Sequence, residues 1–368
     1  MVLTQFNYIH HIYRGTAVAR VIGQNVQSNY IFEKQVNMYV YEEMINGEKL
    51  TDIINKKHEN TKYLPGIKLS DNITAVSDIR KTVADAHLLV FVMPHQFVKS
   101  LCRQIQGHLR PGVKAISLIK GFDCENNKIN LITQYIRSIL HIECCSLSGA
   151  NVAADVANEQ FAETTIGYED VETAQVFQLL FDTPYFKVNA VPDVAGVELC
   201  GALKNIVAIG AGFIDGLQLG SNTKAAIIRL GLLEMRRFAA MFYSGVIEET
   251  FWDSSGVADL ITTCYGGRNR KCAELFIKTK KSFSQIEQEI LNGQKLQGTH
   301  TARDVYVFLT AQGKRQFFPL FTTVYEICDA GAPPDRIVKV FMTKALRPIV
   351  KSHGSSPVQL DELVRSKL

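Results

Sequence analysis

Four apolar runs in the first half of the chain constrain its fold more than any other feature. They cover residues 36–41, 87–93, 113–119 and 143–148. Each run has the length and composition of a buried strand, and helical patterns lie between them. Alternating strands and helices are typical of a parallel sheet with helices on its faces. We therefore expect the first half to be an α/β domain built on such a sheet.

Polar or aromatic residues follow directly after each of these runs. In an open parallel sheet, ligands bind beyond the carboxyl ends of the strands, so these residues are candidates for contact with a ligand. They are Tyr41-Glu42-Glu43, Pro94-His95-Gln96-Phe97, Lys120-Gly121 and Gly149-Ala150-Asn151-Val152-Ala153.

Each of these residues also has a purely structural interpretation. Tyr41 and Phe97 can be core aromatics, and Glu42 or Glu43 can be a solvated acid instead of a ligand of a ribose hydroxyl. Lys120 lies between an apolar strand and a glycine, where its ammonium group would be partly desolvated and would need an anionic or carbonyl partner. A functional and a structural role for Lys120 are both open on this evidence.

The sequence changes character near Val191, after which it is mainly helical. Lys204 lies inside an apolar segment rich in glycine, which allows helices or a ligand to approach closely. A buried lysine can serve as a general acid or base. The alternative is a surface lysine whose aliphatic stem lies along the protein. The apolar residues on both sides favour the buried position.

The segment "GVADLITTCYGGRNRK" (residues 256–271) combines an acid, hydroxyls, glycines and cationic donors. The acid is Asp259, and Thr263, Arg268 and Asn269 are among the donors. Planar guanidinium and amide donors match the oxygens of a phosphate monoester. A charged cluster is more often a solvated face, but the threonines and glycines in the same segment favour a binding site.

Composition excludes several other classes of protein. The 368 residues suggest two domains, and 46% hydrophobic with 21% charged residues is typical of a globular protein. The net charge of +4 comes from interspersed residues, so we expect no nucleic-acid partner. Eight cysteines without a C-x-x-C pair, and nine histidines without ligand spacing, favour a reducing compartment and no metal. No apolar run reaches the roughly 18 residues of a membrane span.

Five segments resemble the NAD-dependent glycerol-3-phosphate dehydrogenases of animals. They are "SLIKG", "GAN", "CGALKNIVAIGAGFIDGLQLGSNTKAA", "GVADLITTCYGGRNRK" and "LNGQKLQG", and the resemblance runs from about Val36 to Leu346. It implies a Rossmann-like parallel-sheet domain over residues 1–190, an all-helical substrate domain over 191–350 and an exposed tail over 351–368. It also implies a homodimer that uses NAD to interconvert dihydroxyacetone phosphate and sn-glycerol 3-phosphate.

The same resemblance implies roles for individual residues. Lys204 would donate the proton to the carbonyl oxygen, Lys120 would hold the substrate and polarise its carbonyl, and Asp259 would orient Lys204. Two ammonium groups near one oxygen would stabilise the developing alkoxide. The substrate would also be bound by Asn205, Thr263, Arg268 and Asn269. The implied NAD contacts are Gly15, Tyr41, Phe97, Asn151, Ala153, Arg268, Lys295 and Gln297.

The first residues depart from the family pattern. Helical spacing begins at Gly15, which would be the third glycine of a dinucleotide-binding turn, and His10 and Ile12 occupy the places of the other two. The preceding stretch is a poor central strand, because Gln5 and Asn7 would face a side that a helix normally covers. Ile12 would fill volume that a pyrophosphate requires, whereas Arg14 would add positive charge.

Two hypotheses follow from this departure. The first is a working dehydrogenase with an altered turn, which we favour because the matched catalytic and substrate residues are intact. The second is a relative with impaired cofactor binding that acts as a dimer partner or binds a phosphate metabolite. An alternative first segment, joined near Gly15, would also explain the abrupt break.

The chain closes with Ser366-Lys367-Leu368, a tripeptide that peroxisomal import receptors read. The residues before it include Gly354, Ser355, Ser356 and Pro357, which are typical of an exposed linker. We therefore expect the protein in the peroxisome, in the cytoplasm or in both.

Overall fold

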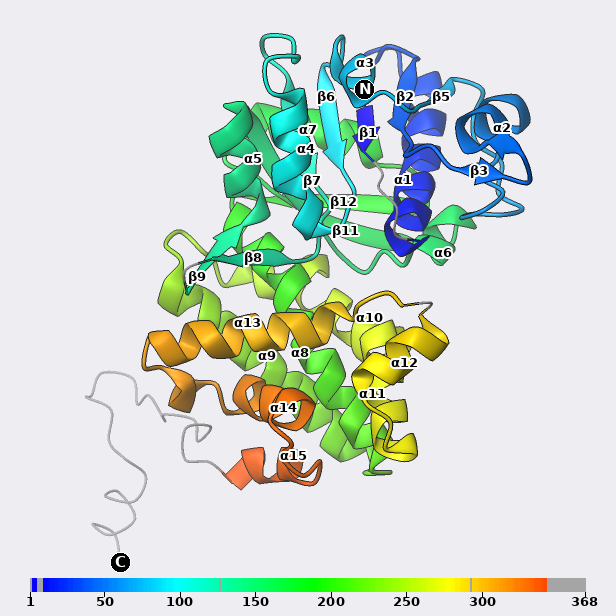
Figure 1. Ribbon diagram of the computed structural model, residues 1–368. Coiled ribbons are helices and arrows are strands. Elements are labelled where there is room, and N and C mark those ends of the chain that lie inside the picture. The colour runs from blue at the N-terminus through cyan, green and yellow to red at the C-terminus, as the bar shows by residue number, and fades with distance from the viewer. Residues whose placement is uncertain (1, 5–8, 126, 292, 343–368) are drawn as a thin grey trace, which may run out of the picture.

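The computed structural model describes the backbone of residues 2–4, 9–125, 127–291 and 293–342, and side chains from residue 13 to 341 within those ranges. The described chain has a sheet part, which comes first in the sequence, and a helical part below it (Figure 1). The expected order of a parallel-sheet part followed by a helical part is confirmed.

The sheet has eight strands in the order β12-β11-β10-β7-β6-β1-β2-β5. Neighbours are parallel except β10 and β11, which are antiparallel. All four apolar runs form strands; β10 has the length of its run, and the other three strands are shorter than theirs. The strands are β1 (Val2–Thr4), β2 (Val36–Tyr39), β5 (Ile73–Val76), β6 (Leu88–Phe91), β7 (Lys114–Ser117), β10 (Glu143–Ser148), β11 (Ala162–Gly167) and β12 (Phe186–Val191).

Helices cover both faces of this sheet, which explains why the central strand β6 is apolar and buried at every residue. On one face, α1 (Ile9–Ser28) and α7 (Val171–Phe181) bury Ile22 and Phe177 against the strands. On the other, α3 (Ile79–Val83), α4 (Val98–Ile105) and α5 (Ile132–Leu140) bury Leu101 and Ile136. The short helices α2 (Leu50–Lys57) and α6 (Ala153–Ala157) flank the sheet, as does the hairpin of β3 (Met44–Ile45) and β4 (Glu48–Lys49).

The N-terminal segment differs from the sequence-based expectation in two ways. Val2–Thr4 is a central strand, paired in parallel with both β2 and β6, so the prediction of a poor strand is wrong for these three residues. Gln5 and Asn7, on which that prediction rested, lie outside the described residues. Helix α1 begins at Ile9 instead of near Gly15, because residues 9–14 contain no glycine or proline to stop it. Gly15 is therefore inside the helix.

The helical part is built around α8 (Val194–Gly216). This is the one described helix with the length and hydropathy of a membrane span, and the whole of its apolar stretch is buried inside the protein, as in a core helix. The other helices pack around it. They are α9 (Ser221–Phe242), α10 (Asp259–Gly266), α11 (Arg268–Thr279), α12 (Phe283–Ile290), α13 (Gln297–Ala311), α14 (Pro319–Asp329) and α15 (Arg336–Lys339).

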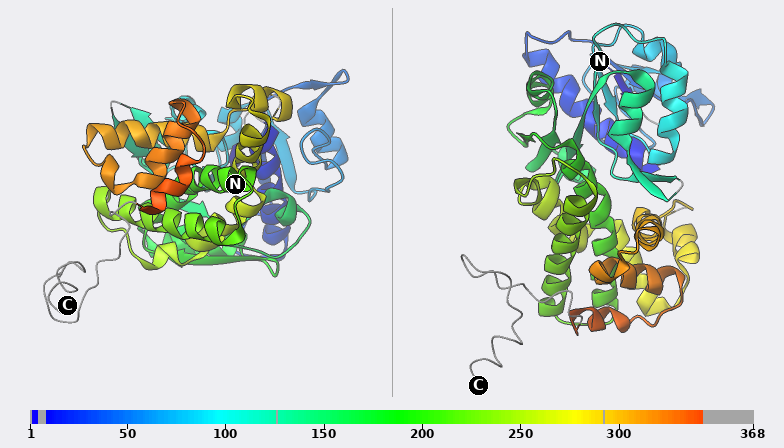
Figure 2. Two further views of the ribbon diagram at one scale, coloured as in Figure 1. Left: turned by 90° about the horizontal axis from the view of Figure 1, so that it is seen from below. Right: turned by 90° about the vertical axis from the view of Figure 1, so that its left-hand side faces the viewer.

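The two parts contact each other at the edge of the sheet where its parallel strands end. The hairpin of β8 (Phe122–Glu125) and β9 (Lys128–Leu131) lies between them (Figure 1) and contacts α13 and α8. Glu198 of α8 accepts hydrogen bonds from Thr133 Oγ1 at 2.6 Å and from the Ile132 and Thr133 amides at the start of α5. The right-hand view of Figure 2 shows the sheet part above the helical part, as in Figure 1.

Candidate active site

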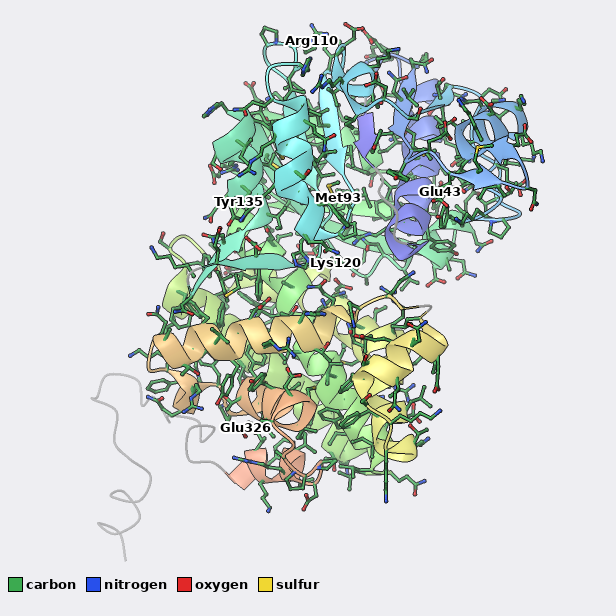
Figure 3. All side chains as sticks on the ribbon, in the orientation of Figure 1. Glu43, Met93, Arg110, Lys120, Tyr135 and Glu326 are labelled. Carbon is green, nitrogen blue, oxygen red and sulfur yellow. The ribbon has the colours of Figure 1, made fainter. Side chains whose placement is uncertain are left out.

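A buried carboxylate lies between two lysines where the sheet part meets the helical part. Asp259, the first residue of α10, accepts a 2.8 Å ion pair from Lys120 Nζ at Oδ2 and an ion pair from Lys204 Nζ at Oδ1. The side chains of Lys204 and Asp259 are only 5% and 4% exposed, whereas Lys120 is 19% exposed. Figure 3 shows Lys120 at this boundary. The prediction that Lys204 is buried is confirmed, and the surface alternative is wrong.

Helix α10 holds Lys204 through two residues one turn apart. Besides the Asp259 carboxylate, Lys204 Nζ donates to Thr263 Oγ1 at 2.8 Å. Thr263 in turn donates from the same hydroxyl to the Asp259 carbonyl oxygen at 2.6 Å. Residues four apart lie on one face of a helix, and in α10 this face is turned toward Lys204 of α8.

The end of β10 supplies further partners of Lys120. Lys120 Nζ donates to Gly149 O at 3.0 Å and to Asn151 Oδ1 at 3.3 Å. Ser148 Oγ donates to Asp259 Oδ2 at 3.3 Å. A Cβ atom on Gly149 would lie 2.6 Å from the Glu163 carbonyl oxygen, so this approach requires glycine. Lys120 and Asn151, predicted at neighbouring strand ends, do lie together.

The electrostatics of the cluster favour an ionised Asp259 and lower the pKa of Lys120. Burial alone would raise the pKa of Asp259, but the adjacent Lys120 and Lys204 outweigh it and hold that pKa below its ordinary value. Burial lowers the pKa of Lys120 well below its ordinary value, against the attraction of Asp259, and the nearby positive charges of Lys204 and Arg14 lower it further. A lysine held in this way beside a carboxylate is a candidate for proton transfer to a bound substrate.

A second set of predicted residues joins three helices beside this cluster. Asn269 of α11 donates from Nδ2 to Asn205 Oδ1 of α8 at 2.9 Å. The Gly298 amide of α13 donates to Asn269 Oδ1 at 3.0 Å. Both asparagine side chains are buried, and their carboxamides are oriented by these bonds.

A cavity of about 370 Å³ opens next to Lys120 between the two parts. A Cβ atom on Gly121 would lie 3.2 Å from Gln297 Nε2 and 3.3 Å from His95 Nδ1, so both side chains border the residue after Lys120. Arg268 donates from Nη1 to Gln294 Oε1 at 3.0 Å at the rim. The residues that line the cavity are Pro94, His95, Gln96, Asp123, Cys124, Arg268, Gln294, Lys295, Gln297, His300 and Asp304.

Apart from His95 at a strand end, the acidic and imidazole side chains of this cavity are not among the residues that the sequence patterns indicate. Asp123 lies in the β8 hairpin, and His300 and Asp304 lie four residues apart on α13, a helical spacing that was the available signal. Burial, with the charge of Asp123, raises the pKa of Asp304 to about 6. Burial also lowers the pKa of His95.

The carboxylates after β2 are engaged within the protein. Glu42 accepts from Thr51 Oγ1 at 2.7 Å, and Glu43 accepts from Tyr63 OH at 2.5 Å and pairs with Lys62. The ribose-binding interpretation of these acids therefore has no support in the geometry. Their neighbour Tyr41 is 46% exposed, which argues against the core-aromatic alternative for that residue.

The remaining predicted residues lie around the same edge of the sheet. Phe97 packs partly buried against the core on the α4 face. Ala153 begins α6, which contacts α1, the helix that contains Gly15. Lys295 is 61% exposed and pairs with Glu287 at 2.8 Å. Within the described part of the chain, no hydrogen bond joins Tyr41, Gly15 or Lys295 to the Lys120–Asp259–Lys204 cluster.

Arg14, which the sequence indicates only as an added positive charge, lies beside the partners of Lys120. From the second turn of α1 it donates from Nη1 to Leu118 O at 2.9 Å and from Nη2 to Asn151 Oδ1 at 3.3 Å. Burial lowers its pKa to about 10, against the attraction of Asp259. Its position directly before Gly15 was the only sequence signal.

Comparison with known proteins identifies relatives over nearly the whole described chain. Residues 14–174 match the family model for the N-terminus of NAD-dependent glycerol-3-phosphate dehydrogenase, and residues 193–339 match the model for its C-terminus. The cytoplasmic NAD(+) glycerol-3-phosphate dehydrogenase of Homo sapiens is 52% identical over 320 residues, which are 87% of this chain and 92% of that relative. The NAD(+) enzyme of Cuphea lanceolata is 50% identical over 336 residues, covering 90% of each chain.

Solved structures agree with this result. Glycerol-3-phosphate dehydrogenase of Plasmodium falciparum superposes with a TM-score of 0.89 at 42% identity, covering 95% of this chain and 96% of that one. The Saccharomyces cerevisiae enzyme superposes with a TM-score of 0.85 at 43% identity, covering 92% and 98%.

Proposed function

Since the chain belongs to the NAD-dependent glycerol-3-phosphate dehydrogenases, we propose that it interconverts dihydroxyacetone phosphate and sn-glycerol 3-phosphate with NAD as cofactor. The observation that carries this proposal is the Asp259 carboxylate held between the buried Lys204 and the partly buried Lys120, where the two parts of the chain meet. Two cations that converge on one point suit a carbonyl oxygen that becomes an alkoxide.

Lys204 is the proton donor in the direction of reduction, and Lys120 polarises the carbonyl. Lys204 Nζ gives its proton to the substrate oxygen as negative charge develops there, and Lys120 Nζ stabilises that charge by a hydrogen bond. Asp259 holds the two ammonium groups together despite their repulsion. The proposal is supported by the ion pairs of Asp259 and by the Thr263 hydroxyl, which fixes the Lys204 rotamer.

The phosphate of the substrate binds near Asn205, Thr263, Arg268 and Asn269. Support comes from the bond between the Asn269 and Asn205 side chains and from the position of Arg268 at the first turn of α11. A guanidinium group and a helix N-terminus both favour a phosphate.

The described residues fit NAD at the edge where the parallel strands end. When bound, NADH supplies the hydride. The exposed Tyr41 ring suits an adenine, and Arg268, Lys295 and Gln297 place charged and amide donors around the cavity beside Lys120. Phe97, Asn151, Ala153 and Gly15 complete the proposed contacts from the strand ends, α6 and α1.

We place the boundary between the cofactor domain and the substrate domain near Val191, with the tail beginning at residue 351. Support comes from the end of β12 at Val191 and the start of α8 at Val194. The two family models divide the chain in the same region.

The proposed function is tested by NADH oxidation at 340 nm with dihydroxyacetone phosphate. We expect turnover by the full chain and its loss in Lys204→Ala, with NADH affinity retained, because Lys204 moves a proton and does not contact the cofactor. Lys278→Ala, which removes a 45% exposed lysine, is the control. Equal loss of NADH binding in Lys204→Ala would overturn the assigned role of Lys204.

The localisation proposed from the relatives is the cytoplasm, because the human protein is named as cytoplasmic. Import into peroxisomes through Ser366-Lys367-Leu368 is a further proposal, and these residues lie outside the described part of the chain. A fluorescent fusion at the N-terminus tests it: removal of the three residues should release peroxisomal protein to the cytosol. Retention would assign import to another signal.

A homodimer is also proposed and is checked by light scattering.

A further inference from the structure

We propose that Arg14 is a positioning residue of the active site, which fixes the Lys120 ammonium group through Asn151 and the Leu118 carbonyl. This inference rests on the proposed function for its meaning in catalysis. Its geometry concerns residues 14, 118, 120 and 151, which come from three different parts of the sheet edge.

Asn151 receives two cations on one oxygen. Arg14 Nη2 and Lys120 Nζ each lie 3.3 Å from Asn151 Oδ1. A carbonyl oxygen accepts two hydrogen bonds, so both contacts can be made at once. The amide end of Asn151 is held separately, because Nδ2 donates to Thr164 Oγ1 at 3.1 Å. The Asn151 side chain is buried and cannot turn away without losing that bond.

Arg14 also holds the backbone that leads into Lys120. Its Nη1 donates to the Leu118 carbonyl at 2.9 Å, two residues before Lys120. One rigid guanidinium group therefore fixes both the chain that carries Lys120 and the oxygen that Lys120 contacts. Its planar fork makes this possible, whereas lysine presents a single ammonium group.

The charges around Lys120 explain why this placement matters for the reaction. Asp259 faces Lys120 from α10, Lys204 faces it from α8 and Arg14 faces it from α1. Asp259 is shared between the two lysines, so the cluster carries an excess of positive charge. Arg14 keeps its own charge near neutral pH, since its pKa is lowered only to about 10. Arg14 lowers the pKa of Lys120, and its removal should raise that pKa.

The test is the pH dependence of Lys120 acetylation by trace acetic anhydride, read by mass spectrometry on the folded full chain. In Arg14→Met and in Arg14→Gln, we expect the midpoint for Lys120 to move up by about one pH unit, so that acetylation at a given pH falls about tenfold. Arg14→Lys, which keeps the charge, should move it less. Arg14→Gln serves where Arg14→Met does not fold.

The matched control is Arg20→Met on the same helix. Arg20 bonds Lys68 O and pairs with Glu159, away from Lys120, so the Lys120 midpoint should stay in place. An unchanged midpoint in both the methionine and glutamine variants at position 14 would overturn the inference. An equal shift in Arg20→Met would also overturn it, because the effect would then belong to the helix.

Turnover separates this inference from the proposed function. With an active wild type, Arg14→Met should lower kcat/KM at least tenfold at neutral pH, with partial recovery in Arg14→Lys. If the wild type shows no turnover but the Lys120 midpoint shifts as expected, the proposed function fails and the positioning role stands. If the wild type turns over and Arg14→Met matches it in kinetics and midpoint, the positioning role fails alone.

Discussion

Asp259 is the residue on which the candidate site depends most. It forms ion pairs with Lys120 and Lys204 from different elements, and its side chain is 4% exposed. Two ammonium groups left together in a buried place without an anion would repel each other and lose their solvation. The pairing therefore shapes the site, and removal of Asp259 alone would leave the two lysines without a compensating charge.

We predict that Asp259→Asn lowers the free energy of unfolding by about 3 kcal/mol, because it leaves the buried Lys204 and the partly buried Lys120 without their partner. Urea unfolding at pH 7 measures this. Asp329→Asn, which breaks a more exposed pair with Arg303, should cost less than about 1 kcal/mol. Equal losses in the two variants would show that the burial of Asp259 has no special cost.

We predict that Arg268→Ala raises the KM for dihydroxyacetone phosphate strongly and also lowers kcat, because binding of the remote phosphate orients the reacting carbonyl. Steady-state kinetics with NADH measures both constants. Lys271→Ala, on an exposed position of the same helix, is the control. An unchanged kcat/KM would remove Arg268 from the site.

The site residues that are recognisable from the sequence are those that lie in distinctive contiguous segments. Lys120, Lys204 and Asp259 each lie in a distinctive local context, so resemblance placed them correctly near one another. Arg14 and the engaged Glu42 and Glu43 could not be foreseen in this way. Their roles depend on partners that only folding brings close, such as Asn151 for Arg14 and Thr51 for Glu42.

At the scale of elements, buried carboxylates hold the starts of two helices. Glu234 of α9 accepts from the Leu320 amide at 2.7 Å and from the Phe321 amide at 3.0 Å at the first turn of α14. Glu198 does the same for α5. These bonds satisfy amides that a helix N-terminus leaves without partners, and they join elements distant in sequence.

We predict that the free energy of unfolding decreases less with rising pH in Glu234→Gln than in the wild type. Burial raises the pKa of Glu234 from its ordinary 4.5 to about 8 in the folded protein. Its stabilising contribution is therefore complete below about pH 4.5 and is lost as pH rises through about 8.

Urea unfolding at pH 5 and pH 8.5 tests this. Between pH 5 and pH 8.5, the free energy of unfolding of the variant relative to that of the wild type should rise by at least about 1.4 kcal/mol, the equivalent of one pKa unit. Glu172→Gln, at an exposed position of α7, should show no such change. A difference independent of pH would contradict the prediction.

The start of α1 is the element that local sequence patterns described least well. The apolar runs predicted the strands because a buried strand needs apolar residues. The start of α1 has no such signal, since it depends on how far the helix continues where no glycine or proline stops it. With α1 beginning at Ile9, its first amides are free of helical partners and can meet an anion.

We predict that the native chain binds NADH and that the His10→Gly, Ile12→Gly double variant binds it no more tightly. Glycine costs about 1 kcal/mol at each helical position, so the substitutions weaken the first turn of α1. Fluorescence titration of both chains measures this. Binding by the double variant alone would favour the relative with impaired cofactor binding.

At the scale of the whole molecule, the candidate site exists only where the two parts meet. Lys120 and Asn151 come from the sheet part, and Lys204, Asp259 and Arg268 come from the helical part. The cavity between them is lined by residues of both. The order of the two parts was predictable from the change in pattern near Val191. The cavity was not, because its lining joins residues of the strand ends, the β8 hairpin and α13 that lie far apart in the sequence.

The most direct test of this account is the fate of a deuteride during the reaction. The full chain is incubated with dihydroxyacetone phosphate and with NADH that carries deuterium at both positions of C4, and the product is analysed by mass spectrometry. We predict sn-glycerol 3-phosphate with one deuterium at C2. Recovery of unchanged dihydroxyacetone phosphate and unoxidised NADH would contradict the assignment of this chain as a working dehydrogenase.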